Sequence, residues 1–298
     1  MATITLLDGS IGQELLKRSG DAATPLWSTQ VMMDHPDLIE AVHDSYFKVG
    51  ATVATTNTYA ILRDRLEPAG IADKLEPLTN IALTAACSAR DAAGKGRVAG
   101  SIGPLGASYR PDLAPSPEEA AQQYAEPVNL MVDHVDMLLL ETMASVEQVE
   151  GALRACVGRG KPVWLGVTVD DDNGARLRSG ESLQELQPVL QQHTPDAILI
   201  NCSRPEAIGA ALDVIKGFDL PFGAYANGFT HISEAFLDDK PTVDALSQRH
   251  DLTPKAYADF AMQWVDQGAT IVGGCCEVGP AHIEALAKRL QETGHTIA

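Results

Sequence analysis

Apolar runs recur along the chain, and most are followed by a segment with the pattern of an amphipathic helix. Several runs are continuously apolar, which is typical of parallel strands that are buried on both faces. We predict eight strands, at residues 4–7, 52–56, 97–101, 135–140, 162–168, 197–200, 222–226 and 270–272. The longest additional segments follow the first, second, third and seventh of these strands.

Start signals mark several of the helical segments between the strands. Ser116, Pro117 and Glu119 supply an N-cap, a first-turn proline and a capping-box glutamate. Ser145 and Ser182 are followed at the same spacing by Gln148 and Glu185. Further helices are predicted at residues 36–49, from Pro254 after the Thr253 N-cap, and from about Pro280. Strand and helix alternate without a linker, so we predict one domain covering residues 1–298.

Eight strand–helix units in 298 residues predict an α/β fold of the (β/α)8 TIM-barrel type. A doubly wound open sheet is the alternative. The first strand is followed at residues 8–12 by DGSIG, which lacks the G-x-G-x-x-G pattern common in such sheets. In a barrel the carboxyl ends of the strands meet on one face, where the loops build the substrate site.

Composition and charge narrow the range of partners. The formal net charge of -18 argues against a nucleic-acid partner, which would require a basic face. The amino-terminal residues lack a signal-peptide pattern, and no uninterrupted apolar stretch reaches transmembrane length. We therefore expect a cytoplasmic protein with small-molecule substrates, no nucleic-acid or membrane partner, and five reduced cysteines.

Acids, amides and thiols directly follow the predicted strands. They are Asp8, Asn57, Glu141, Asn201, Cys202, Asn227, Cys275 and Cys276. Cys275 and Cys276 are adjacent, and a disulfide between neighbouring residues would be strained. They could be small buried apolar residues, or could join Cys202 in a three-thiolate zinc site with one position open for water or a substrate thiol.

These residues form the rim of the predicted barrel, where the strands end. The residue types found there argue against several other catalytic mechanisms. No lysine ends a strand, which argues against a Schiff-base aldolase. The eight histidines do not cluster, and Cys202 has no evident histidine base. Cys87 and Cys156 fall in helical patterns, where we expect them to pack. Asp8 and Glu141 remain as groups that could hold a cation such as an α-ammonium. Glu141 requires a cationic or hydrogen-bonding partner because it follows an apolar strand.

Six short segments carry a resemblance to a known family. They are DGSIGQEL at residues 8–15, TNTY at 56–59, GSIGP at 100–104, ETM at 141–143, NCS at 201–203 and GGCC at 273–276, with Pro280, His282 and Ile283 following. The Asn-Cys and Gly-Gly-Cys-Cys elements together are the specific part. Over nearly its whole length, the chain resembles the homocysteine S-methyltransferases.

The resemblance implies a barrel that binds Zn2+ through three cysteines, which match Cys202, Cys275 and Cys276. These residues would act in catalysis through the zinc, with the homocysteine thiolate at its open position. The acidic residues that hold the homocysteine amino group match Asp8 and Glu141. The backbone near Gly9 would contribute to binding the carboxylate. The rim amides Asn57 and Asn227 are further candidates for substrate binding.

The chain most resembles the short, cobalamin-independent type, which uses S-methylmethionine or S-adenosylmethionine. Betaine-using relatives carry a carboxyl-terminal extension, and cobalamin-dependent methionine synthases carry further modules that are not seen here. The loop after the seventh strand departs from the common Tyr-Pro-Asn pattern, with Ala226 in place of proline. Tyr109 and Arg110, in the loop after the third strand, are candidate donor contacts.

Two alternative functions remain at this point. The first is a related thiol or selenol methyltransferase that uses betaine or another onium donor. The second is a zinc-dependent homocysteine sensor without turnover. Donor turnover would separate them, because both would bind zinc and a thiol.

Overall fold

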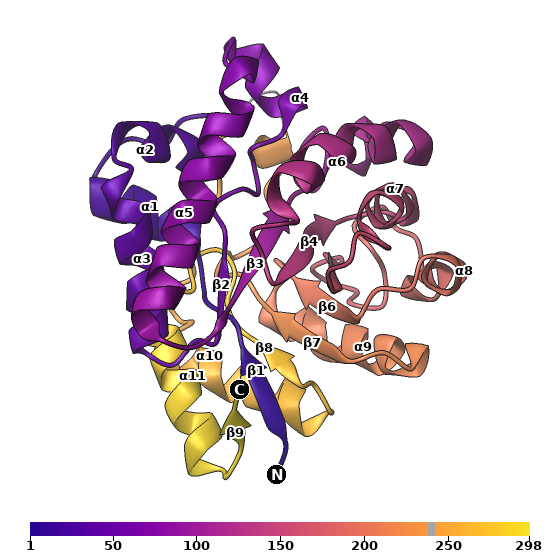
Figure 1. Cartoon of the computed structure of the whole chain (residues 1–298). Helices are drawn as coiled ribbons and strands as arrows, with labels where there is room; N and C mark the ends of the chain where they lie inside the picture. The colour runs from indigo at the N-terminus through magenta and orange to yellow at the C-terminus, as the bar shows by residue number, and fades with distance from the viewer. Residues whose placement is uncertain (238–241) are drawn as a thin grey trace.

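The computed structural model describes residues 1–237 and 242–298, and its core is a curved parallel sheet surrounded by helices (Figure 1). The strands are β1 (Thr3–Leu6), β2 (Val53–Thr55), β3 (Arg97–Ile102), β4 (Met137–Met143), β5 (Val163–Val167), β6 (Ala197–Asn201), β7 (Phe222–Tyr225), β8 (Ile271–Val272) and β9 (Thr296–Ile297). Their order in the sheet is β2-β3-β4-β5-β6-β7-β8-β1-β9. All eight predicted strands are confirmed.

The sheet closes between β1 and β2. Leu7, just after β1, forms a parallel bridge with Val53 of β2. Two backbone hydrogen bonds flank this bridge, from Asp8 N to Val53 O at 3.2 Å and from Thr52 N to Leu6 O at 2.7 Å. The sheet is therefore a closed barrel of eight strands. The strand β9, which the sequence did not predict, pairs with Thr3 and Ile4 of β1.

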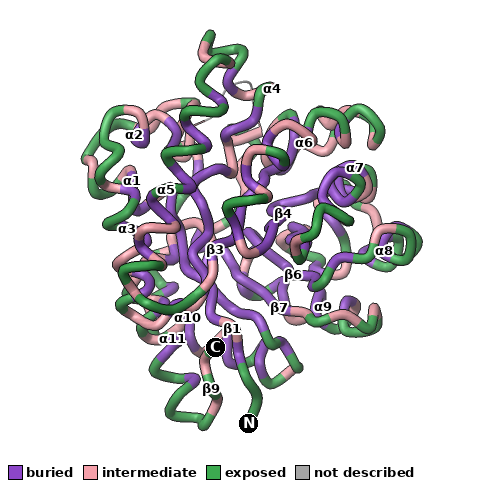
Figure 2. The backbone as a smooth tube through the Cα atoms, in the orientation of Figure 1, coloured by how far each residue is buried: buried purple, intermediate pink, exposed green. Residues whose placement is uncertain are grey.

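Helices cover the outside of the barrel, with their exposed sides facing away from the strands (Figure 2). They are α1 (Ile11–Ser19), α2 (Ser28–Asp34), α3 (Asp37–Lys48), α4 (Arg63–Leu66), α5 (Leu75–Ala93), α6 (Pro117–Met131), α7 (Val146–Cys156), α8 (Gln187–Gln192), α9 (Pro205–Ile215), α10 (Pro254–Asp266) and α11 (Pro280–Glu292). Among the described residues, no helix is long and apolar enough to cross a membrane.

The predicted helix starts are confirmed, with one change. Ser116, Ser145 and Thr253 each accept a hydrogen bond from the backbone N–H three residues later. Ser182 also caps a helix, but the first turn is a 3-10 helix, Leu183–Leu186, before α8 begins. The starts of α5 and α9 were not predicted, because their N-cap residues are Lys74 and Arg204 rather than serine or threonine.

Two apolar layers stabilise this arrangement. The larger lies between the strands and the helices and includes Ile198 and Ile200 of β6. The smaller fills the inside of the barrel with alternate residues of the strands. Its members are Leu7, Val53, Ala99, Met137, Leu139, Trp164, Ala197, Leu199, Tyr225 and Ile271, with Cys275 packed against them. The cysteine loop thus rests directly on the interior of the barrel.

Leu139→Ala should lower the free energy of unfolding by about 2–5 kcal/mol, because it leaves a cavity at a fully buried position inside the barrel. Urea denaturation measures the change. The control is Ile81→Ala on α5, where the side chain is 36% exposed and the expected change is below about 0.5 kcal/mol. Equal effects of the two substitutions would contradict the assignment of Leu139 to the core.

Candidate active site and metal centre

The three predicted cysteine ligands come together at the carboxyl ends of two strands. Cys202 directly follows β6, and Cys275 and Cys276 follow β8. Their sulfur atoms all lie within 4.8 Å of one another. The distance between the sulfurs of Cys202 and Cys276 is 3.7 Å. Strand ends that are 74 residues apart in the chain thus supply one compact group of thiols.

Two glycines allow the loop after β8 to reach this position. A Cβ atom on Gly273 would lie 2.4 Å from Cβ of Leu7, and one on Gly274 would lie 2.2 Å from Cγ1 of Val278. Both distances are too short for non-bonded carbon atoms. The backbone can therefore pass close to β1 and carry Cys275 and Cys276 inward only because these residues lack side chains.

The geometry and chemistry of the cysteines fit a soft metal ion. In tetrahedral zinc sites the Zn–S distance implies sulfurs about 3.8 Å apart, close to the separation of Cys202 and Cys276. Hydrogen bonds from the thiols of Cys275 and Cys276 hold the pKa of the Cys202 thiol well below its usual range. The same hydrogen bonding to Cys202 raises the pKa of the Cys275 and Cys276 thiols. A cation would replace the two protons that the group otherwise retains.

Asp8 lies just after β1 and is almost completely buried. One carboxyl oxygen accepts a hydrogen bond from Thr55 N at 2.6 Å, and the other accepts one from Thr55 Oγ1 at 2.8 Å. Burial raises the pKa of the Asp8 carboxyl to about 8, because the hydrogen bonds from Thr55 only partly offset the loss of hydration.

Glu141 is the second buried carboxyl group. The sequence placed it after the fourth strand, but β4 continues to Met143 and changes register between Leu140 and Met143. Glu141 therefore lies in an irregular part of β4, where a bulge can redirect a side chain. Asn201 holds this segment, because its side-chain amide accepts from Thr142 N at 2.9 Å and donates to Thr142 Oγ1 at 3.0 Å.

Hydroxyl groups satisfy the Glu141 carboxyl in place of a cation. Ser101 Oγ donates to one oxygen, and Tyr225 OH donates to the other at 3.0 Å. Burial raises the pKa of Glu141 to about 7, although these two hydroxyls lower it. Within the described parts of the chain, neither Asp8 nor Glu141 forms an ion pair. The site thus holds two carboxyl groups that can receive a cation.

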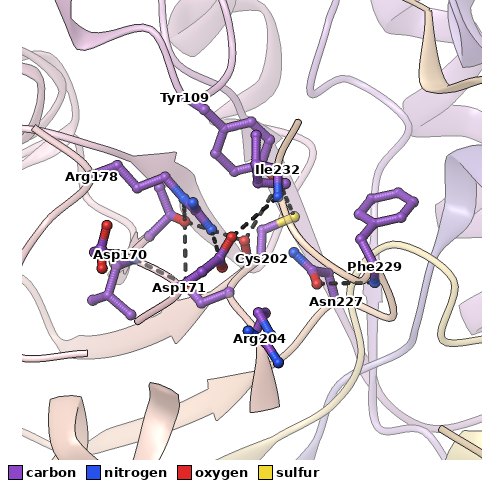
Figure 3. Close-up of polar contacts among 12 residues, drawn as sticks. Tyr109, Asp170, Asp171, Arg178, Cys202, Arg204, Asn227, Phe229 and Ile232 are labelled. Carbon is purple, nitrogen blue, oxygen red and sulfur yellow. Dashed lines mark hydrogen bonds and ion pairs between the residues drawn. The ribbon is translucent and has the colours of Figure 1, made fainter. Parts of the chain in front are cut away.

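The cysteines and both carboxyl groups line one cavity of about 900 Å³. Gly9 and Asn57 line it as well, and the Asn57 amide donates to Ser28 O at 3.4 Å. Asn227 is buried, but among the described residues it is not part of this lining. Its side-chain oxygen accepts from Phe229 N at 3.2 Å (Figure 3).

Two aromatic residues with no role predicted from the sequence form another part of the cavity wall. The rings of Trp27 and Tyr59 meet edge to face, with centroids 6.4 Å apart. Trp27 has a φ of 47° in the left-handed region, and its ring lies where a Cβ on Gly12 would be, 2.0 Å from Cζ2. The segments DGSIGQEL and TNTY contained Gly12 and Tyr59, but contact with Trp27 is not visible in sequence.

The comparisons with known proteins agree with this geometry. The family model described as homocysteine S-methyltransferase matches residues 5–290. Homocysteine S-methyltransferase of Escherichia coli strain K12 is 32% identical, over 96% of this chain and 95% of that protein. The chain belongs to the homocysteine S-methyltransferase family. The prediction of a methyltransferase is thereby confirmed.

Other members of the family cover most of this chain as well. Selenocysteine Se-methyltransferase of Brassica oleracea var. italica is 24% identical, over 96% of this chain and 88% of that protein. The crystal structure of the metallated form of the homocysteine methyltransferase MmuM from Escherichia coli superposes with a TM-score of 0.80 at 28% identity, covering 96% of each chain. This match supports the barrel fold, and that relative is a metal-binding protein.

Asp8 gives this member of the family a testable dependence of stability on pH. The pKa of Asp8 is about 8 in the folded protein, above the ordinary value of 3.8. Between these two values the folded state binds a proton at Asp8 that the unfolded state has lost. The free energy of unfolding therefore falls as the pH rises from about 4 to about 8. In the metal-free protein, Asp8→Asn should therefore gain stability relative to the wild type by up to about 1.4 kcal/mol per pH unit. Urea denaturation at pH 5, 6, 7 and 8 measures this difference, and a constant difference would contradict it.

Proposed function

We propose that this protein transfers a methyl group from a sulfonium donor, S-methylmethionine or S-adenosylmethionine, to the thiolate of L-homocysteine and forms methionine. Zn2+ would be held by Cys202, Cys275 and Cys276. One observation carries the proposal: three thiols able to share a metal line the same cavity as two buried carboxyl groups without cationic partners. Residues 1–298 would form the homocysteine-binding barrel domain.

The cysteine group would hold the metal and leave one position for the substrate sulfur. The chemistry that bound zinc supplies is stabilisation of the homocysteine thiolate at neutral pH, where a free thiol is mostly protonated. Cys202, Cys275 and Cys276 fix where this sulfur lies, because their strand ends are held by the barrel. A thiolate in a fixed position needs only a correctly oriented methyl donor.

Asp8 and Glu141 would bind the ammonium group of homocysteine. Both are buried and hydrogen-bonded to neutral donors, so an incoming cation would favour their ionised forms. The backbone near Gly9 would hold the substrate carboxylate, and Asn57 would contact the substrate from the loop after β2. Asn227 would act indirectly by supporting the loop after β7.

The aromatic part of the cavity favours an onium donor. Trp27 and Tyr59 line the cavity, and an aromatic ring attracts a cation such as a sulfonium. The guanidinium carbon of Arg65 already lies 5.8 Å from the centroid of the Tyr59 ring, so a cation is accepted at this ring. Transfer of the methyl group neutralises both reactants, because a thiolate and a sulfonium become two thioethers. The protein would need to align the two sulfurs and to exclude water, rather than to supply a proton.

The donor can be identified directly. Zinc-loaded protein with homocysteine should form methionine from S-methylmethionine or S-adenosylmethionine, and not from betaine, as measured by mass spectrometry. Cys275→Ala should lose bound zinc, measured by elemental analysis, together with at least about 100-fold of the activity. Full activity in a zinc-free variant would rule out the proposed mechanism, and turnover with betaine alone would rule out the proposed donor class.

Glu141→Gln should weaken homocysteine binding by about 10–100-fold, because it removes a negative charge from the ammonium site while preserving the shape of the side chain. Zinc content should stay unchanged. Calorimetric titration of the zinc-loaded protein measures the affinity. The matched control is Glu147→Gln, an exposed position at the start of α7, where the affinity should remain unchanged. An unaltered affinity in Glu141→Gln would show that the carboxylate does not bind the ammonium group.

A further inference from the structure

The proposed reaction brings one electrophile close to several sulfur nucleophiles. Cys202, Cys275 and Cys276 line the cavity in which donor and acceptor would meet. Attack by a cysteine thiolate would form a bond from its sulfur to the methyl carbon. The bond from that carbon to the sulfonium sulfur would break, leaving its electron pair on a neutral thioether. The resulting S-methylcysteine is no longer a thiolate ligand.

Tyr109, from the loop after β3, contacts one of these three sulfurs. Its hydroxyl donates a hydrogen bond to Sγ of Cys202 at 2.9 Å, and the side chain is buried and lines the cavity. Among the described residues, Cys275 and Cys276 receive no hydrogen bond from any side chain outside the three cysteines. The contact therefore distinguishes Cys202 from the other two sulfurs.

A largely buried ion pair packs against the ring of Tyr109 (Figure 3). The guanidinium carbon of Arg178 lies 4.9 Å from the centroid of the ring. Arg178 is paired with Asp171 at 2.7 Å, and the two side chains are only 11% and 14% exposed. The other oxygen of Asp171 accepts from Ile232 N at 3.1 Å. Loops that follow β3, β5 and β7 thus meet around one tyrosine.

Tyr109 and Cys202 are both held in backbone conformations unusual for their residue types. Their φ angles are 62° and 48°, in the left-handed region that favours glycine. Thr168 Oγ1 donates to Cys202 O at 3.2 Å and accepts from Arg178 Nε at 3.1 Å. Arg178 therefore contacts both the tyrosine ring and the residue that fixes the cysteine backbone. This arrangement maintains the short contact between hydroxyl and sulfur.

We propose that Tyr109 is a positioning residue that directs methyl transfer away from Cys202. Its hydroxyl donates to the sulfur, which engages a lone pair and lowers the nucleophilicity of the thiolate. A thiolate that binds its electron pair more tightly attacks carbon more slowly. The hydroxyl has a single hydrogen, which Cys202 occupies, so the homocysteine sulfur keeps its full reactivity. This inference rests on the proposed transfer from a sulfonium in this cavity.

Selective alkylation tests the inference. Zinc-loaded full-length protein, without homocysteine, is treated with deuterated iodomethane, and the label on each cysteine is measured by peptide mass spectrometry. In Tyr109→Phe we expect labelling of Cys202 to rise by about three- to tenfold, with Cys275 and Cys276 unchanged. Zinc content is measured on the same samples. The control Tyr124→Phe also removes a buried hydroxyl, but one that donates to Gly103 O, and its labelling should match the wild type.

Two results would overturn the inference: unchanged labelling of Cys202, or an equal rise at all three cysteines. If Tyr109→Phe does not fold, Arg178→Gln is judged by the same criterion, with a smaller selective rise expected at Cys202. A second arm replaces iodomethane with S-methylmethionine or S-adenosylmethionine that carries a deuterated methyl group, and homocysteine is added. Selective labelling by iodomethane without methyl transfer from either sulfonium to homocysteine would contradict the proposed donor class and leave the role of Tyr109 intact.

Discussion

The structure depends on the close packing of the β8 exit against β1. Gly274 N donates to Asp8 O at 2.9 Å, and Cys275 N donates to Ala226 O, just after β7, at 2.9 Å. The backbone that carries Cys275 and Cys276 is thus held between the ends of β7 and β1, the two strands that neighbour β8. Because β1 also closes the barrel against β2, the same closure sets the position of Asp8. The packing of the β8 exit against β1 therefore determines both the closure of the barrel and the position of the site residues.

Buried acidic groups dominate the electrostatics of the cavity. Burying carboxyl groups is unfavourable, and the raised pKa values of Asp8 and Glu141 reflect that cost. The cysteines similarly retain protons that a metal ion would replace. The raised pKa values of these carboxyl groups and the close grouping of the three thiols are the features that support the proposed metal-assisted reaction of an amino-acid thiol.

Unusual backbone conformations concentrate around this cavity. Six described residues other than glycine have positive φ angles. Of these, Trp27, Tyr109 and Cys202 line the cavity, as does Thr142, and Glu277 directly follows Cys276. Such conformations persist only where surrounding contacts enforce them. Here those contacts include the ion pair of Arg178 with Asp171 and the side-chain amide of Asn201.

The sequence by itself determined the barrel and the groups at its rim. Continuous apolar runs located all eight barrel strands, and parallel strands place their carboxyl ends on one face, so the sequence alone predicts that Cys202, Cys275 and Cys276 lie together. Only the tertiary structure decided the partners of these groups. The sequence placed Asn201 and Asn227 at strand ends and suggested substrate binding for Asn227, yet Asn201 holds β4 and Asn227 holds its own loop. The contacts of Tyr109 with Cys202 and Arg178 join segments far apart in the chain, and no local pattern encodes which long-range neighbours a loop residue meets.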